Sequence, residues 1–244
     1  YYKLPVASAQ VKSALILASL TARGISKIEE KSKSRNNTEV MLEEFGAKIN
    51  YSDKNNVIKV EGTSFLTGVD IKVPGDPSSA AFIAVASLLT KNSKVTLNNI
   101  LYDKFRLTIF EVLKKMGAEI NITPSNNKKT CSIKVSHSKL KNIKIDSKLN
   151  TALIDEFPIL SIAAVHASGV MTLKNLDELR YKESDRLNAI YENLKICGVQ
   201  IKSKENDLII TGCSNVIGGC QIDAKNDHRI AMAFNILSLI SSKP

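Results

Sequence analysis

The segment Arg180-Tyr-Lys-Glu-Ser-Asp-Arg186 joins a predicted strand to a predicted helix, and five of its seven residues are charged. A carboxylate flanked by cations beside a loop is a typical arrangement for acid–base groups and anion clamps. Arg186 follows Glu183 by three residues, so the two side chains share one helix face. The same charges also suit an ordinary helix N-terminus, because the helix dipole favours acids in the first turn. The segment therefore predicts either a site for anionic molecules or a charged surface.

Polar clusters also open several predicted apolar helices. Asn226-Asp-His-Arg229 precedes one helix, whose free N–H groups and arginine would together bind an anion. Asp155 stands at the mouth of another helix, where its carboxylate could act as a base toward a molecule held outside. Polar groups at 8–13 and 34–37 open two more helices. Helix capping explains each cluster taken alone, but together they could converge on a shared cleft.

The helices that position these clusters belong to a repeated unit. Each copy has an apolar helix, a short strand, an amphipathic helix closed by Gly, and two alternating strands joined by a polar turn. The predicted helices are 13–20, 38–45, 79–89, 107–116, 157–166 and 185–197; the strands are 25–29, 48–51, 57–60, 94–98, 119–122, 132–135, 170–175, 200–202 and 208–210; the turns are 53–56, 124–127 and 205–207.

This order predicts an α/β fold of βαβαββ units repeated roughly every 70–80 residues. A fourth copy is expected to begin with a strand at 221–223 and a helix at 227–239. Helices such as 80–88 are apolar nearly all round, so we expect them to be buried among sheets. A pseudo-symmetric α/β domain fits these repeats better than an open doubly wound sheet.

Composition narrows the classes of function. No apolar run approaches the roughly 20 residues that span a bilayer, and no secretory signal is visible, so the sequence predicts a cytoplasmic protein. The net charge of +10 suits either nucleic acid or small anionic substrates. Its lysines are dispersed and no arginine-rich stretch accompanies them, which favours small anions. The four cysteines form no CxxC pair and are expected to be reduced thiols rather than metal ligands.

Six motifs in order along the chain resemble the EPSP synthase (3-phosphoshikimate 1-carboxyvinyltransferase) family. They are Leu4-Pro-Val-Ala-Ser-Ala-Gln-Val-Lys-Ser13, Ser34-Arg35 with Thr38-Glu39, Val73-Pro-Gly-Asp-Pro-Ser-Ser-Ala-Ala-Phe82, Ile154-Asp-Glu-Phe-Pro158, Arg180-Tyr-Lys-Glu-Ser-Asp-Arg186 and Asp227-His-Arg-Ile-Ala-Met-Ala233. Several motifs in register are far more specific than any one of them.

The resemblance implies a reaction and a role for each matching residue. The 5-hydroxyl of shikimate 3-phosphate would add to C2 of phosphoenolpyruvate while C3 gains a proton, and phosphate would then leave. Asp155 would take the hydroxyl proton and Glu183 would be a second proton-transfer group. The implied shikimate 3-phosphate contacts are Ser8, Ala9, Gln10, Arg35, Asp155 and Lys182, and the implied phosphoenolpyruvate contacts are Gln10, Arg186 and Arg229. No metal or organic cofactor is implied.

The resemblance also implies two domains with the active site between them. Residues 1–73 would complete the domain that grips shikimate 3-phosphate, residues 74–244 would supply most of the second domain, and the hinge would lie at 73–76. The family's Lys-Ser-Arg and Asn-Ala-Gly-Thr motifs and its last strands with a catalytic Lys are absent from this chain. We therefore expect a fragment that is inactive alone, from a protein that is monomeric at full length.

Two alternatives share parts of this pattern. The UDP-N-acetylglucosamine enolpyruvyl transferase has the same fold and uses phosphoenolpyruvate, but residues 8–10 and 180–186 favour shikimate 3-phosphate. An RNA 3′-phosphate cyclase contains the same repeat, which leaves a basic RNA-binding module as the alternative from another class. We expect small-molecule substrates, with neither nucleic acid nor membrane as a partner.

Overall fold

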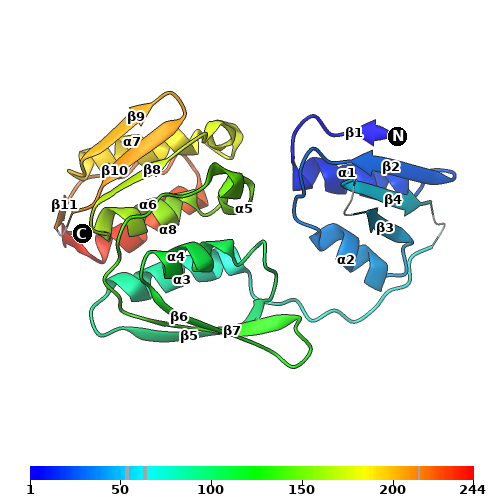
Figure 1. The fold of residues 1–244 in the computed structure, drawn as a ribbon, viewed down its shortest axis with the longest axis horizontal. Helices are drawn as coiled ribbons and strands as arrows, with labels where there is room; N and C mark the ends of the chain where they lie inside the picture. The colour runs from blue at the N-terminus through cyan, green and yellow to red at the C-terminus, as the bar shows by residue number, and fades with distance from the viewer. Residues whose placement is uncertain (53–54, 63–64, 214) are drawn as a thin grey trace. The chain divides into compact units, whose positions relative to one another are not determined.

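The computed structural model describes residues 1–52, 55–62, 65–213 and 215–244. The chain divides into two compact units, Tyr1–Val73 and Pro74–Pro244, each with its own hydrophobic core (Figure 1). The turn predicted at 53–56 falls partly on residues 53 and 54, which lie outside the described residues.

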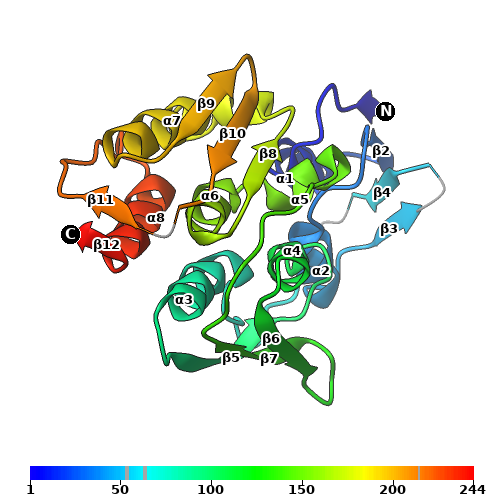
Figure 2. The same cartoon turned by 60° about the vertical axis from the view of Figure 1, so that its left-hand side comes forward.

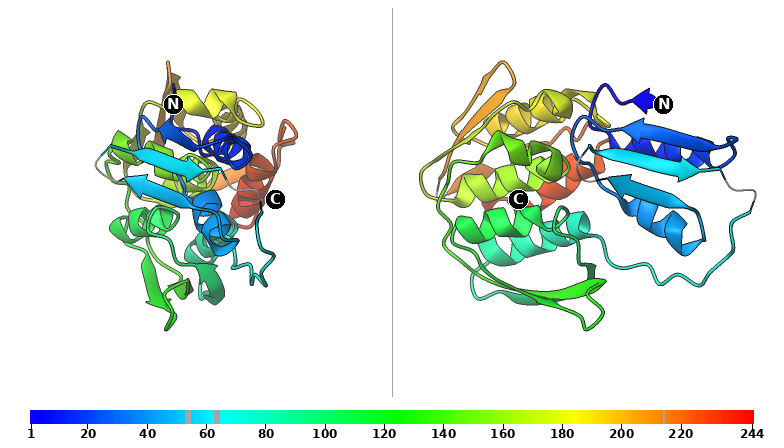
Figure 3. Two further views of the ribbon diagram at one scale, coloured as in Figure 1. Left: turned by 90° about the vertical axis from the view of Figure 1, so that its right-hand side faces the viewer. Right: turned by 45° about the vertical axis from the view of Figure 1, so that its right-hand side comes forward.

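The first unit is a four-stranded sheet with two helices on one face (Figure 3). Its elements are β1 (Tyr2–Lys3), α1 (Ala9–Ser19), β2 (Ile25–Glu29), α2 (Asn37–Glu44), β3 (Ile49–Ser52) and β4 (Val57–Glu61). The strand order is β1-β2-β4-β3, in which β1 and β2 are parallel and the other neighbours are antiparallel. Ile16 on α1 packs with Ile58 and Val60 on β4, and all three are fully buried.

The second unit contains two three-stranded antiparallel sheets, β5-β7-β6 and β8-β10-β9, and a short parallel pair, β11 and β12. Its strands are β5 (Lys94–Leu101), β6 (Glu119–Pro124), β7 (Thr130–Ser136), β8 (Val170–Leu173), β9 (Ile201–Lys204), β10 (Asp207–Thr211), β11 (Val216–Gly218) and β12 (Ser241–Lys243). Its helices are α3 (Pro77–Leu89), α4 (Thr108–Lys115), α5 (Asn150–Leu153), α6 (Phe157–His166), α7 (Arg186–Ile196) and α8 (His228–Ser238), with short 3₁₀ turns η1 (Ser147–Leu149) and η2 (Asp177–Tyr181).

The predicted order of helix, strand, helix and two strands is confirmed in all three copies, and each predicted strand pair is an antiparallel hairpin. The strand that precedes each copy is reduced to β1 in the first and to the single parallel bridges Gly75–Ile100 and Lys141–Ser168 in the next two. These contacts complete the βαβαββ unit that the sequence predicts.

The strand predicted at the start of the fourth copy is wrong, whereas the helix predicted at 227–239 is confirmed as α8. Residues 221–223 form no strand, and the copy begins instead with β11, which pairs in parallel with β12 as β1 does with β2. The physical reason is a side chain of α7: Asn193 Nδ2 donates to the Asp223 carbonyl at 2.9 Å, and the Asp223 N–H donates to Asn193 Oδ1 at 3.0 Å. These bonds use the backbone N–H and carbonyl of Asp223, which are then not available for pairing with another strand.

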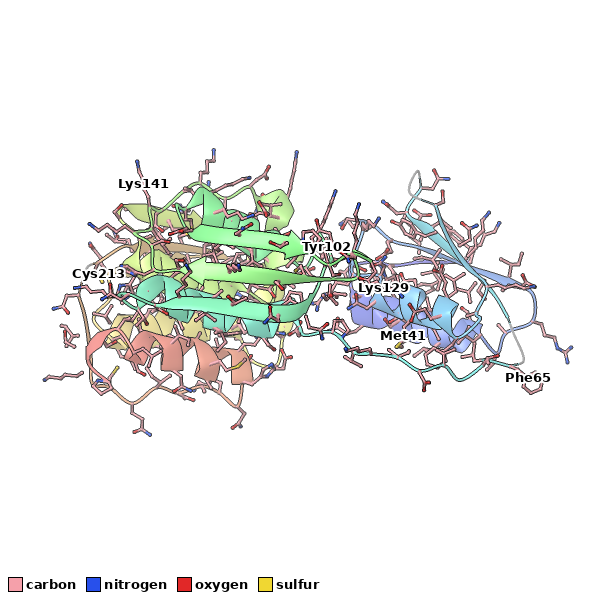
Figure 4. All side chains as sticks on the ribbon, turned by 90° about the horizontal axis from the view of Figure 1, so that it is seen from below. Met41, Phe65, Tyr102, Lys129, Lys141 and Cys213 are labelled. Atoms are coloured by element: carbon pink, nitrogen blue, oxygen red, sulfur yellow. The ribbon has the colours of Figure 1, made fainter. Side chains whose placement is uncertain are left out.

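Apolar helices form the centre of the second unit, as predicted. Every residue of α6 from Phe157 to Val165 is buried, and α6 contacts both α3 and α8 (Figure 2). The sheet β5-β7-β6 packs on α3, as the view in Figure 4 shows, while β10 packs on α6. This packing fixes the ends of α6, α7 and α8 relative to one another, and those ends carry the charged motifs.

Helix α3 offers a matched test of this core, because Leu88 is fully buried whereas Ile83 on the same helix is 48% exposed. We expect Leu88→Ala to lower the free energy of unfolding by ~2–5 kcal/mol, since it removes buried contacts and leaves a cavity. Ile83→Ala should cost less than about 0.5 kcal/mol. Urea unfolding followed by circular dichroism measures both, and equal losses would contradict the described packing.

Candidate functional site

Three helix starts of the second unit carry the candidate site. Asp185 caps α7 by accepting from the Asn188 N–H at 3.0 Å, and Asp227 caps α8 by accepting from the Arg229 N–H at 2.9 Å. Asp155 lies two residues before α6. Because α6, α7 and α8 contact one another, their charged starts lie close enough to form ion pairs.

Arg186, the first residue of α7, is at the centre of these pairs. Its side chain is fully buried, and its three guanidinium nitrogens face three carboxylates from three chain segments. Nε lies 2.7 Å from Asp227 Oδ2, Nη1 lies 3.1 Å from Asp155 Oδ1, and Nη2 lies 2.5 Å from Glu183 Oε2. One guanidinium thus ties the starts of α6 and α8 to that of α7.

Asp155 lies between two guanidiniums. Besides Arg186, the Arg229 Nη2 lies 3.7 Å from Asp155 Oδ2, and Arg229 Nη1 donates to the Asp155 carbonyl at 3.3 Å. The side chains of Asp155 and Arg229 are only 13% and 14% exposed, whereas that of Glu183 is 55% exposed. The cluster is therefore closed on the Asp227 side and open to solvent on the Glu183 side.

Asp227 is the buried carboxylate of the cluster. Burial alone would raise the pKa of Asp227, but hydrogen bonds from Arg186 and its positive charge outweigh that effect and lower it. The Ser184 hydroxyl also donates to Asp227 Oδ2 at 3.1 Å. The lowered pKa favours the ionised form of Asp227, which balances the charge of the buried guanidinium. Asp155 is mostly enclosed, whereas Glu183 is the carboxylate of the cluster that lies at its open side.

Buried polar residues also surround Glu156, which follows Asp155 in the chain. Glu156 is 3% exposed and accepts a hydrogen bond from the Ser78 hydroxyl at the start of α3. Burial raises the pKa of Glu156, and the Ser78 hydrogen bond opposes this only in part. Asp76 caps α3 and forms an ion pair with Arg106. The hydrogen bond between Ser78 and Glu156 therefore joins the starts of α3 and α6.

Arg180 and Lys182, the other basic residues of the segment 180–186, lie in different environments from each other. Arg180 fastens η2 to the turn between β9 and β10, through Nε to Asn206 Oδ1 at 3.0 Å and Nη2 to the Glu205 carbonyl at 2.8 Å. It also pairs with Asp185 at 2.8 Å, which makes its role structural. Lys182 is half-buried in extended backbone directly after η2.

The remaining predicted residues lie in the first unit. Ser8 caps α1 by accepting from the Val11 N–H at 3.3 Å, Ala9 is half-buried and Gln10 is exposed in the first turn. Arg35 is half-buried in the connection between β2 and α2. Both groups of residues stand at the start of a helix, as the sequence predicted.

A buried lysine connects these two helix starts. Lys12 of α1 is 1% exposed and forms ion pairs with Glu39 at 2.8 Å and Glu30 at 3.4 Å. The Ser34 N–H also donates to Glu30, at 3.2 Å. This cluster holds the segment that carries Arg35 against α1.

Sequence reasoning treated Asp227 as a helix cap and overlooked Lys12 and Glu156. Asp227 is a cap, but the same carboxylate also binds Arg186 from 41 residues away. The available signals were the one charged residue in the helix at 9–19 and a glutamate directly before a run, 157–165, that is apolar except for Ser161. Neither signal identifies a partner, because the partners are distant in the chain.

Within the described residues, no group of three or more His, Cys, Asp or Glu side chains is arranged to hold a metal ion. None of the helices in the described ranges has the length and apolarity that crossing a membrane requires.

Comparison with known proteins gives one consistent result. The family pattern of EPSP synthase (3-phosphoshikimate 1-carboxyvinyltransferase) matches residues 1–244. The chain is 45% identical to the 3-phosphoshikimate 1-carboxyvinyltransferase of Petrotoga mobilis and 42% identical to that of Thermoanaerobacter sp. (strain X514), covering 100% and 99% of this chain. It spans 57% of the length of each relative.

A solved structure of EPSP synthase from Acinetobacter baumannii superimposes with a TM-score of 0.88 at 36% identity, covering 99% of this chain and 56% of that one. The described architecture is thus the enolpyruvyl transferase fold of repeated α/β units. The chain belongs to the EPSP synthase family.

Arg186 gives a sharp prediction about stability. Arg186→Met should lower the free energy of unfolding by ~3–5 kcal/mol, because it leaves the Asp227 carboxylate buried without its cation. Lys225→Met, which breaks the exposed pair with Asp223, should leave stability nearly unchanged. Adding Asp227→Asn to Arg186→Met should recover part of the loss. Denaturant unfolding of these three variants and of the single variant Asp227→Asn measures this, and additive losses in the double variant would contradict a direct pair.

Glu156 gives a prediction about pH. Because its pKa is raised above the ordinary value of 4.5, the folded chain binds this proton more tightly than the unfolded chain. Its contribution to stability is complete below the unfolded pKa and is lost as the pH rises through the folded pKa. Glu156→Gln keeps a neutral acceptor for Ser78 and does not titrate. As the pH rises above the ordinary value of 4.5, the wild-type free energy of unfolding should fall relative to that of the variant; parallel curves would contradict this.

Proposed function

We propose that the protein to which this chain belongs transfers the enolpyruvyl group of phosphoenolpyruvate to the 5-hydroxyl of shikimate 3-phosphate and releases phosphate. The observation that carries the proposal is the carboxylate of Asp155 between Arg186 and Arg229, in a member of the EPSP synthase family. Both substrates are phosphorylated anions, and fixed guanidiniums are the groups that hold such anions in place. The reaction needs no redox chemistry, and these residues supply charge and proton transfer.

Asp155 and Glu183 divide the proton transfers in this proposal. Asp155 takes the proton of the 5-hydroxyl as its oxygen bonds to C2, and Glu183 is the second acid–base group for the proton added at C3 and later removed when phosphate leaves. Addition and elimination need an acid and a base on different atoms. Asp155 is enclosed and oriented by two arginines, whereas Glu183 stands at the open edge of the cluster, so the two carboxylates have distinct environments.

Arg186 and Arg229 bind phosphoenolpyruvate in this proposal. Arg186 holds Asp227 on its buried side and Glu183 on its exposed side. An incoming anion therefore competes with Glu183 for Nη2. Displacement would release the glutamate for proton transfer at the moment the substrate arrives.

Ser8, Ala9, Gln10, Arg35 and Lys182 bind shikimate 3-phosphate in this proposal, and Gln10 also approaches phosphoenolpyruvate. Residues 1–73 form part of the domain that grips shikimate 3-phosphate, residues 74–244 most of the other, and 73–76 the hinge. Because the chain spans 57% of its relatives, the complete site draws on further segments, such as those in the relatives. The proposed protein acts on small molecules in the cytoplasm, as a monomer, without nucleic acid as a partner.

The catalytic roles are testable in a chimera in which residues 1–244 replace the matching part of the Petrotoga mobilis relative. With phosphoenolpyruvate and shikimate 3-phosphate, Asp155→Asn and Glu183→Gln should each lower kcat by on the order of 10²–10⁴-fold, because each removes a proton-transfer group but keeps its size. Asp223→Asn, at an exposed pair outside the cluster, should leave kcat unchanged. Phosphate release measures all three variants.

Two results would overturn the proposal. One is a chimera that releases phosphate with UDP-N-acetylglucosamine but not with shikimate 3-phosphate. The other is unchanged kcat in both acid variants. The 244-residue chain alone should show only background release, and a rate near that of the chimera would contradict its expected incompleteness.

A further inference from the structure

Cys197 and Cys220 lie side by side in the second unit, although 23 residues separate them in the sequence. Cys197 follows the last turn of α7, and Cys220 lies between β11 and α8. Their sulfur atoms are 3.4 Å apart, close to van der Waals contact, and both are free thiols. A disulfide bond is about 2.05 Å long, so the sulfurs need to approach by only about 1.4 Å.

Bonds that involve neither sulfur impose this proximity. On one side of Cys220, the Gly218 N–H faces the Cys197 carbonyl at 3.5 Å. On the other side, Asn193 of α7 makes two hydrogen bonds to the backbone of Asp223, at 2.9 and 3.0 Å. The segment around Cys220 is thus fastened to α7 at both ends, with the thiol pair between the attachments.

The two thiols differ in access. Cys197 is 3% exposed, and burial, followed by the hydrogen bond with Cys220, raises its pKa to about 12. Cys220 is half-buried, and both cysteines border a small hollow lined also by Gly219, Phe234 and Lys243. An oxidant from solvent therefore reaches Cys220 first.

We propose that Cys197 and Cys220 are a thiol-oxidation site at which hydrogen peroxide converts the pair into an intramolecular disulfide. The Cys220 thiolate attacks peroxide: an S–O bond forms, the O–O bond breaks, and the departing hydroxide takes a proton to become water. The Cys197 sulfur then bonds to Cys220 sulfur, the S–O bond breaks, and the second hydroxide leaves with the Cys197 proton as water. Two thiols lose two electrons and two protons, and one peroxide becomes two water molecules.

Preorganisation makes the second step effective although Cys197 is protonated. Two groups held in contact react as if at very high concentration, which compensates for a small thiolate fraction. The product would tie the end of α7 covalently to the segment that enters α8. This proposal concerns the chain itself and does not depend on the proposed transferase activity.

The test uses the 244-residue chain, reduced and then treated with hydrogen peroxide, with free thiols counted after denaturation. We expect two of the four thiols to be lost and to return with dithiothreitol. Trypsin leaves Cys197 in a peptide 196–202 but leaves Cys213 and Cys220 together in 205–225. The link is therefore mapped in a Cys213→Ser background, where the two peptides should be joined and lighter by two hydrogen atoms.

Matched variants distinguish this pair from the other thiols. Cys213, labelled in Figure 4, follows β10 and is also half-buried, so Cys213→Ser should leave the loss of two thiols intact. Cys131→Ser should do the same, whereas Cys197→Ala and Cys220→Ala should each abolish the intramolecular link. Circular dichroism before oxidation verifies that each variant is folded.

The pH dependence of thiol loss and the melting temperature of the oxidised chain give two further tests of the proposed disulfide. The rate of thiol loss should rise with pH, because the thiolate is the attacking form. The oxidised chain should melt at a higher temperature than the reduced chain, because the crosslink restricts the unfolded state. A link through Cys213, crosslinks only between chains, irreversible oxidation of Cys220 without Cys197, or a lower melting temperature after oxidation would each overturn the proposal.

Discussion

A buried guanidinium is the constraint on which the second unit depends. Arg186 is fully buried, and a desolvated cation is tolerated only where carboxylates surround it with good hydrogen-bond geometry. Asp227, Asp155 and Glu183 meet that requirement from the starts of three different helices. The packing of α6, α7 and α8 and the positions of the charged groups in the candidate site therefore depend on each other. A shift of any of these helices would break an ion pair in the interior.

The first unit also contains a buried cation held by carboxylates, and here the cation is a lysine. Lys12 lies among Glu30 and Glu39, and Ser34 donates to Glu30. In both units a buried cation connects a helix to a loop that is distant in sequence and carries proposed substrate contacts. Such clusters give the loops a defined position that their exposed residues alone could not supply. The cost is that the cluster tolerates little substitution, since each charge is needed to neutralise another.

Local patterns explain why much of the fold was predictable. Gly46, Gly117 and Gly198 close the second helix of each copy with positive φ, and the alternating strands that follow are all hairpins. The candidate residues were located because charges gather at helix starts. Their partners were not, because a cap pattern reports only bonds within a few residues. Nothing near Asp227 indicates Arg186, and nothing near Gln221 indicates that Asn193 satisfies the backbone there. Those pairings are set by tertiary packing.

The partners of Arg186 also explain how a buried guanidinium could still bind a substrate in the proposed reaction. Asp227 is buried and its lowered pKa reflects a strong interaction, so separating it from Arg186 would leave a charge in the interior. Glu183 is more than half exposed, so water solvates its carboxylate when the pair parts, while Arg186 keeps its buried partner Asp227. A substrate anion would therefore replace Glu183 and leave Asp227 in place. The guanidinium would stay where the fold holds it, and only the carboxylate proposed to move protons would be released.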